Sequence, residues 1–170
     1  MNITIKQVPC TDESFLDYYQ NEQNMKLHRG LIATDGFPFG FIAINEDTNK
    51  IVGISMIINE DMHNQLIMYD KKHNDTNPWI MGLAVTEQYR HQGIARKIID
   101  NMLEYCNSFG YSKINLNTET ATEFYSKNWK IDMVSTDMVD IDGKQLPSDT
   151  IRIDIKENLK LENKKSKMKI

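Results

Sequence analysis

The segment YRHQGIAR, Tyr89 to Arg96, brings together residue types that suit the binding of a phosphate group. A helical pattern of apolar residues begins at Gly93, and the first N–H groups of any helix lack intrahelical partners. No Ser, Thr, Asp or Asn directly precedes this pattern to cap it, and Gly93 permits backbone conformations that are closed to other residues. Exposed amides, the helix dipole and the charges of Arg90 and Arg96 therefore predict an anion site at the start of this helix.

The spacing of this loop excludes two common nucleotide-binding loops. A mononucleotide P-loop needs Lys followed by Ser or Thr after its last glycine, whereas Ile94 and Ala95 follow Gly93 here. A dinucleotide fingerprint needs three glycines, and this loop has one. What remains is Arg-x-x-Gly-x-Ala after an apolar run, a pattern that is also compatible with an ordinary strand–turn–helix connection.

A buried strand is expected on each side of this loop and helix. Trp79–Val85 is a continuous apolar run, which is typical of a strand buried on both faces. From Ile94 to Cys106 apolar residues recur at helical spacing, and Gly110 is placed to end that helix. Lys113–Asn117 is the next expected strand. Because a crossover helix connects the two strands, they are predicted to be parallel.

The remaining elements predict antiparallel pairing around that parallel pair. A helix is expected to begin at Thr11 or Ser14, each of which is a possible N-cap. The last two strands are expected on either side of the segment DIDGKQLPSD, residues 140–149. We also expect strands over 2–8 and 64–70, a hairpin over 39–59 and a short helix over 121–128. The predicted fold class is α/β (α+β): one domain with a mixed, mostly antiparallel sheet flanked by helices.

Composition and charge favour one domain over residues 1–155 followed by a basic tail. The chain has 170 residues, 40% of them hydrophobic, and no apolar run long enough to span a membrane. Its polar start does not resemble a signal peptide, so a cytoplasmic protein is expected. Residues 156–170 hold six Lys and two Glu, which is +4, and the chain total of −4 leaves −8 for the rest. We interpret this tail as solvated and flexible; a role in nucleic-acid binding is the alternative, although the acidic remainder disfavours it.

The cysteine and histidine residues indicate neither a redox site nor a metal site. Cys10 and Cys106 are far apart in the sequence, and the four His residues show no metal-ligand spacing. We expect both cysteines to be reduced packing residues and expect no metal.

Two further features, taken with the loop, resemble the GNAT N-acetyltransferase superfamily, whose acyl-CoA loop is usually written Gln/Arg-x-x-Gly-x-Gly/Ala. The strand before the loop ends in GLAV and is followed by TEQYR. Downstream, LNTETATEFYSKNW (residues 116–129) resembles the family's later motif, a strand end followed by a helix that carries Phe-Tyr. The resemblance implies a GNAT fold in which the parallel strands splay apart and the pantetheine of acetyl-CoA lies in the gap.

The resemblance also implies which residues bind the coenzyme. The backbone of Leu83, Ala84 and Val85 is expected to pair with pantetheine, and the Arg90 side chain is expected to brace the loop. The amides expected to surround the diphosphate are those of His91, Gln92, Gly93, Ile94, Ala95 and Arg96.

By the same resemblance, Tyr125 matches the tyrosine that commonly acts as general acid. When an amine attacks the thioester, CoA leaves as a thiolate, and a well-placed phenol can protonate it. The alternative is that Tyr125 packs beside Phe124 as a core aromatic. Thr118 stands where the family often has Asn, so its hydroxyl is expected to bond to the coenzyme or to the next helix. Asn128 replaces a glycine of the motif and is expected to end that helix in a left-handed conformation.

The implied reaction is direct transfer of an acetyl group to a primary amine, on a small molecule or a peptide, in a ternary complex. A backbone N–H near Val85 would polarise the thioester carbonyl. The protein is expected to be a monomer or homodimer without a nucleic-acid or membrane partner. The alternative is a non-catalytic acyl-CoA-binding or regulatory domain, which would keep the loop and dispense with the proton relay.

The sequence names several candidates for the base and for the acceptor pocket, without deciding among them. An alkylamine with a pKa near 10.4 must lose a proton before it can attack, so a proton acceptor is needed. The candidates are Glu60, Asp61, His63 and Glu119. The aromatic residues that could line an acceptor pocket, or instead pack in the core, are Phe37, Phe39, Trp79 and Trp129.

Overall fold

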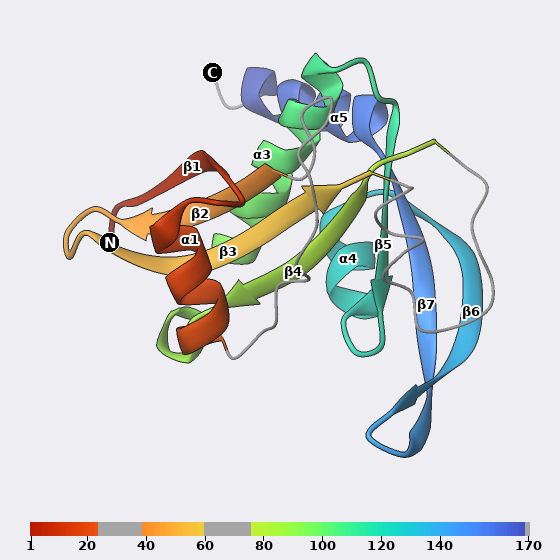
Figure 1. The fold of residues 1–170 in the computed structure, drawn as a ribbon. Helices are drawn as coiled ribbons and strands as arrows, with labels where there is room; N and C mark the ends of the chain where they lie inside the picture. The colour runs from red at the N-terminus through yellow and green to blue at the C-terminus, as the bar shows by residue number, and fades with distance from the viewer. Residues whose placement is uncertain (24–38, 60–75, 169–170) are drawn as a thin grey trace.

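The computed structural model describes residues 1–23, 39–59 and 76–168 and contains one seven-stranded sheet (Figure 1). Neighbouring strands are antiparallel except for β4 and β5, which are parallel, so the predicted mixed sheet is confirmed. In spatial order the strands are β1 (Ile3–Pro9), β2 (Phe39–Asn45), β3 (Lys50–Ile58), β4 (Trp79–Val85), β5 (Lys113–Thr118), β7 (Lys144–Asp154) and β6 (Ile131–Ile141).

Helices cover both faces of the sheet (Figure 1). On one face lie α1 (Glu13–Asp17) and the π-helical turn η1 (Tyr18–Glu22) that continues it. A Cβ atom on Gly40 of β2 would lie 2.6 Å from the ring of Phe15, which shows how closely α1 packs there. On the other face lies α3 (Ile94–Ser108), whose Tyr105 contacts Phe41 of β2 with ring centroids 5.4 Å apart. The same side carries the short 3-10 turn η2 (Glu87–Tyr89), α4 (Thr122–Asn128) and α5 (Ile155–Met168).

The helix α3 has the apolar face and the end that its sequence predicts. Ile98, Ile99, Met102 and Cys106 are fully buried against the sheet. Gly110 adopts a left-handed φ of 84° just beyond the last turn. The N–H of Gly110 donates to the Asn107 carbonyl and that of Tyr111 to the Cys106 carbonyl, the paired bonds of a Schellman ending.

The strands β4 and β5 diverge soon after they meet. Their register contains one pair, Trp79 with Asn115. On its other side β4 pairs with β3 through a shift of register between Ile54 and Met56. Two residues of β4, Gly82 and Leu83, therefore stand opposite one residue of β3, which is a β-bulge, and Gly82 has a φ of 65°. The sheet is open at its centre, beyond the paired end of β4.

Several sequence predictions about local structure need correction. The N-cap of α1 is Asp12, whose Oδ1 accepts from the Phe15 N–H at 3.0 Å, and neither Thr11 nor Ser14. Asn128 does not take a left-handed conformation; its side-chain amide donates to the Phe124 carbonyl within the helix. The strand predicted over 64–70 lies outside the described residues.

The last hairpin is longer than the sequence predicts. Most of the segment 140–149, expected as a connection, belongs to β6 and β7. Asp142 and Gly143 alone form the turn, with φ of 52° and 79°. Positive φ at both residues matches the twist of a tight two-residue hairpin, and Asp-Gly is a preferred sequence for it.

The basic segment after residue 155 forms a helix, whereas a flexible tail was expected. In α5, Asn158 is 9% exposed and Leu159 packs against the core. The Asn158 Oδ1 accepts from the Lys130 N–H at 2.9 Å, while its Nδ2 donates to the carbonyls of Lys130 at 3.0 Å and Asp154 at 2.7 Å. These bonds fix α5 to the start of β6. Within the described ranges, no helix has both the length and the apolar character needed to cross a membrane.

Replacing Asn158 with Ala should destabilise the fold measurably. The change removes three hydrogen bonds, two of them to the main-chain N–H and carbonyl of Lys130. We expect a loss of about 2–3 kcal/mol in the free energy of unfolding and a melting temperature lower by roughly 4–12 °C. Lys160→Ala, at an exposed position of the same helix, is the control and should change stability by less than about 0.5 kcal/mol. Urea denaturation and thermal melting, each followed by circular dichroism, compare the two variants with the wild type. Equal stabilities of Asn158→Ala and the wild type would show that α5 is not fixed through Asn158.

Candidate active site

The loop between β4 and α3 is held in a shape that leaves the start of α3 uncapped. The Arg90 Nε donates to the Val85 carbonyl at 3.0 Å, so this side chain braces the loop as predicted. His91 and Gly93 both have left-handed φ, 61° and 79°. Gly93 is the N-cap of α3, without a side-chain hydrogen bond, and no acidic residue lies in the first turn. A Cβ atom on Gly93 would meet nothing within 4 Å, so the backbone here faces open space. Amide groups in such a turn form an anion-binding concavity.

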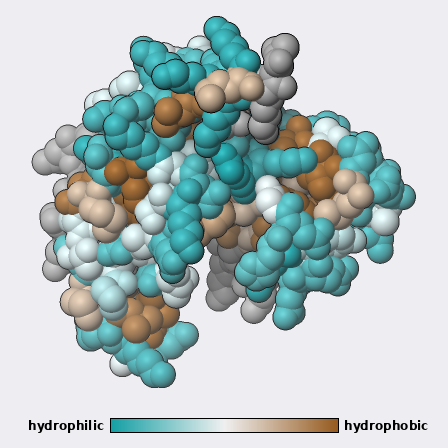
Figure 2. All heavy atoms as spheres, turned by 180° about the vertical axis from the view of Figure 1, so that it is seen from behind, coloured by the Kyte–Doolittle hydropathy of each residue, from teal (hydrophilic) through white to brown (hydrophobic). Residues whose placement is uncertain are grey.

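A hollow of about 590 Å³, which we name the loop hollow, lies on this loop and on the end of β4. Seen from the side that carries α3, the molecular surface is deeply indented (Figure 2). The lining residues are Leu83, Ala84, Val85, Tyr89, Arg90, His91, Gly93, Ile94, Ala95, Arg96 and Phe124.

A second hollow of about 300 Å³, the strand hollow, occupies the gap between β4 and β5. It shares Leu83 and Phe124 with the loop hollow, so the two are neighbours along the same cleft. Its lining residues come from β4, from the end of β5 and from α4, and include Gly82, Thr118, Glu119 and Tyr125. The cleft thus runs from the uncapped helix start to Tyr125 of α4, beside the gap between β4 and β5.

Tyr125 lies at the inner end of this cleft and is shielded from water. Its side chain is 5% exposed, and its ring contacts Phe124 and Trp129 with centroid distances of 5.2 and 5.9 Å. Burial raises the pKa of Tyr125 to about 12, so the hydroxyl is protonated at neutral pH. No hydrogen bond to this hydroxyl is found among the described residues. The ring packs as a core aromatic while the hydroxyl remains available to a ligand.

Thr118 serves the next helix, which is one of the two roles expected of it. Its Oγ1 accepts from the Ala121 N–H at 2.9 Å and from the Thr120 N–H at 3.4 Å. Ala121 is the N-cap of α4 and has no side-chain bond of its own. Thr118 therefore fixes the start of the helix that carries Tyr125.

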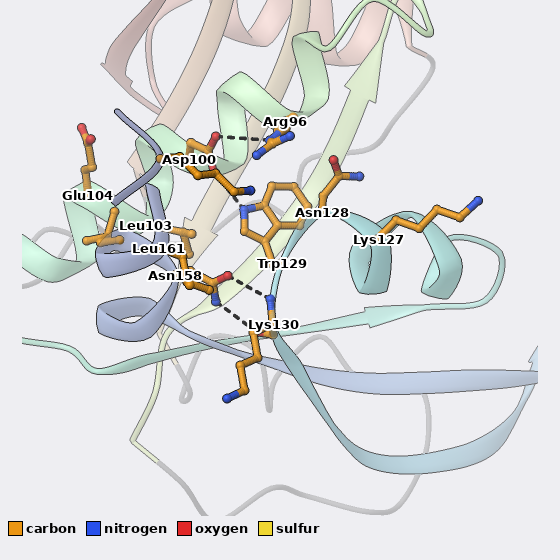
Figure 3. Close-up of a pocket in the computed structure, with 12 residues that line it drawn as sticks. Arg96, Asp100, Leu103, Glu104, Lys127, Asn128, Trp129, Lys130, Asn158 and Leu161 are labelled. Atoms are coloured by element: carbon orange, nitrogen blue, oxygen red, sulfur yellow. Dashed lines mark hydrogen bonds and ion pairs between the residues drawn. The ribbon is translucent and has the colours of Figure 1, made fainter. Parts of the chain in front are cut away.

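A third hollow of about 230 Å³, the helix hollow, lies between α3, the end of α4 and α5 (Figure 3). It shares Arg96 with the loop hollow. The Trp129 Nε1 donates to the Asp100 Oδ1 at 2.9 Å, and Asp100 forms an ion pair with Arg96 at 3.8 Å. The charged residues of its lining are Arg96, Lys127, Lys130 and Lys165 against Asp100 and Glu104, a net charge of +2.

The structure brings most of the predicted coenzyme-binding residues into the cleft. The exception is Gln92, which does not line it; its side-chain amide donates to the Gln88 carbonyl at 3.3 Å. Of the base candidates, Glu119 lines the strand hollow, whereas Glu60, Asp61 and His63 lie outside the described residues.

The aromatic candidates for the acceptor pocket pack elsewhere or lie outside the described part of the chain. Trp79 and Trp129 are core residues, 1% and 6% exposed. Phe39 stacks on Tyr105 with ring centroids 5.2 Å apart, on the α3 side of the sheet. Phe37 is outside the described residues.

Sequence reasoning missed Tyr89, Phe124 and Gly82 as site residues. Tyr89 and Phe124 directly precede the predicted site residues Arg90 and Tyr125 in the sequence, and this adjacency could have identified them. Gly82 lies inside an apolar run, and an isolated glycine in a strand is a recognised sign of a bulge. Among the residues that the structure describes, no group of three or more His, Cys, Asp or Glu side chains is placed to hold a metal ion.

Comparisons with known proteins agree with this architecture. The model of the acetyltransferase (GNAT) family matches residues 4–129. A comparison with curated protein sequences gives no significant match. Among solved structures, NAA60 of Arabidopsis thaliana, determined in complex with acetyl-CoA, is similar with a TM-score of 0.59 and 17% identity, covering 91% of this chain and 99% of that one.

Two bacterial structures are similar to the same degree. An N-acetyltransferase from Staphylococcus aureus has a TM-score of 0.63 and 14% identity, covering 91% of this chain and 99% of its own. An IAA acetyltransferase from Bacillus cereus has a TM-score of 0.58 and 14% identity, covering 90% and 99%. At these identities the structures establish a shared fold.

Proposed function

Because the chain belongs to the GNAT acetyltransferase family, we propose that it transfers an acetyl group from acetyl-CoA directly to a primary amine. The observation that supports this most strongly is the continuous cleft that joins the uncapped start of α3 to the buried hydroxyl of Tyr125. One end of the cleft suits a diphosphate and the other suits a leaving thiolate.

The chemistry of the cleft fits coenzyme A along its length. The left-handed turns at His91 and Gly93 and the positive end of α3 suit the diphosphate. Beyond the single paired position, β4 has no hydrogen-bonded neighbour in β5, so backbone groups of Leu83 to Val85 can pair with the amides of pantetheine. Past Arg96, the basic helix hollow suits the phosphorylated adenosine end.

The residues at the inner end of the cleft suit acyl transfer. The coenzyme supplies a thioester, and the backbone near the bulge at Gly82 and Leu83 would hold its carbonyl. Tyr125 would donate its proton to the departing sulfur. Because burial raises the pKa of the Tyr125 phenol to about 12, proton transfer to a thiolate whose conjugate thiol has an ordinary pKa of about 8.5 is unfavourable. Exclusion of water from the site also raises the pKa of the thiol, which reduces the difference between the pKa values of the thiol and the phenol.

The amine must arrive unprotonated or lose a proton in the site. The pKa of a primary alkylamine lies about 3.4 units above neutral pH, so removing its proton at that pH costs roughly 4.6 kcal/mol. Glu119 is the acidic residue among those that line the strand hollow, and we assign it the role of accepting this proton, directly or through water.

The assignment of the loop predicts a specific loss on replacing Gly93 with Ala. Alanine in this left-handed position costs roughly 1–2 kcal/mol of stability, and its methyl group points into the space proposed for the diphosphate. Gly110→Ala is the matched control, because Gly110 has a similar φ of 84°, equally open surroundings and a place at the other end of the same helix.

Both glycine variants should lose similar stability, while Gly93→Ala alone should weaken acetyl-CoA binding by about tenfold or more. Calorimetric titration with acetyl-CoA measures the affinity. Equal affinities in the two variants would show that the loop does not hold the diphosphate.

Turnover tests the function itself. Thiol release from acetyl-CoA is followed over a panel of small amines, polyamines and peptides with free amino groups. Tyr125→Phe should lower kcat by ~10²- to 10⁴-fold while acetyl-CoA affinity is kept, since only a proton donor is lost. Unchanged turnover in this variant would remove Tyr125 from the mechanism. Tight binding of acetyl-CoA without turnover on any amine would favour the alternative, a non-catalytic acyl-CoA-binding domain.

A further inference from the structure

A second buried tyrosine, Tyr19, has the same unusual feature as Tyr125. Its side chain is 4% exposed, and burial raises its pKa, so it is a neutral phenol. No hydrogen bond to its hydroxyl is found among the described residues. The adjacent residue shows the usual arrangement: the Tyr18 hydroxyl lies 2.7 Å from the Thr86 Oγ1 and accepts from the Gln23 Nε2 at 2.9 Å. A buried hydroxyl without a partner is unfavourable, and such groups in a native structure call for an explanation.

Tyr19 touches the open centre of the sheet from the face opposite to the cleft. It stacks on Phe15 of α1, with ring centroids 5.8 Å apart, and so belongs to the α1 side. A Cβ atom on Gly82 would lie 2.7 Å from the Tyr19 hydroxyl oxygen. Gly82 is a bulge residue of β4 and lines the strand hollow together with Tyr125. Two phenols without a hydrogen-bond partner among the described residues therefore lie on either side of Gly82: Tyr125 lines the strand hollow from α4, and Tyr19, which is outside that lining, lies against Gly82 from η1.

The local backbone around Tyr19 and Gly82 is built for this approach. Tyr19 lies in a π-helical turn, a rare conformation that is frequent at functional sites. Gly82 has a φ of 65° and no side chain, so the hydroxyl comes close to the main chain of β4. A residue with any side chain at this position would separate the hydroxyl from the gap.

We propose that the hydroxyl of Tyr19 binds and orients the amine acceptor. This inference rests on the proposed function and adds to it a residue that positions the acceptor. The coenzyme cleft opens on the α3 and α4 side, so a nucleophile that reaches the thioester carbonyl through the gap comes from the α1 side. The oxygen of a neutral phenol accepts a hydrogen bond from an amine N–H, which directs the nitrogen lone pair away from Tyr19 and toward the gap.

The test compares Tyr19→Phe with Tyr18→Phe. Each change removes one hydroxyl from adjacent buried rings, and of the two hydroxyls only that of Tyr18 is bonded to a residue that the structure describes. The probes are acetyl-CoA with methylamine, with spermidine and with a tetrapeptide that begins with Ala. The measurements are kcat/KM for each amine, the affinity for acetyl-CoA and the melting temperature.

For every probe that the wild type acetylates, Tyr19→Phe should lower kcat/KM for the amine by about tenfold or more and leave acetyl-CoA affinity unchanged. Its melting temperature should not fall, because no bond within the described protein is lost. Tyr18→Phe should show the reverse pattern, a lower melting temperature and a smaller change in kcat/KM for the amine.

Two outcomes would overturn the assignment, and they differ from each other. If the wild type acetylates a probe and Tyr19→Phe matches it in kcat/KM, Tyr19 does not bind the acceptor, and the proposed function stands. If the wild type binds acetyl-CoA and acetylates neither these probes nor any amine of the wider panel, the acetyltransferase function and the role of Tyr19 are both contradicted.

Discussion

The divergence of β4 from β5 is the constraint on which the rest of the structure depends. Parallel strands normally continue their ladder side by side, but here the register holds one pair, Trp79 with Asn115. The gap persists because each strand is paired on its other side, β4 with β3 and β5 with β7. The sheet therefore stays one structure while polar backbone groups at its centre remain without strand partners. Such groups require hydrogen bonds from somewhere, and a ligand that carries amides can supply them.

The gap is also the region of the sheet that the α3 amides, Tyr125 and Tyr19 approach from its two faces. The helix α3 begins just beyond the end of β4, so its uncapped amides lie at one end of the cleft. Tyr125 reaches the gap from α4, and Tyr19 reaches Gly82 from the opposite face. A direct transfer needs a donor and an acceptor that are held separately and meet at one point. A closed sheet would keep them apart, whereas a sheet that opens at its centre lets them meet.

The sequence predicted the parts of this arrangement that depend on short-range patterns. The continuous apolar run of β4, the helical period of α3 and the glycine at position 93 indicated the strand, the helix and the uncapped start of that helix directly. It did not predict α5, because a lysine-rich terminal segment is typical of a flexible tail. The attachment of this helix depends on hydrogen bonds between Asn158 and Lys130, next to the start of β6, which form only in the folded chain. The contact of Tyr19 with Gly82 was equally hidden, since residues 63 positions apart in sequence meet only in the folded chain.

Buried polar groups of the core differ from those near the cleft in their hydrogen bonding. Ser55, Asn115 and Thr150 are fully buried or nearly so, and each has a partner at 2.9–3.2 Å. The hydroxyls of Tyr19 and Tyr125 are buried to a similar degree, and each lacks a partner among the described residues. Each such group costs about 1–3 kcal/mol, a considerable part of the 5–15 kcal/mol by which proteins of this size are stable. Two such phenols, one lining the strand hollow and the other against Gly82, are therefore better explained by ligands that bond to them than by packing.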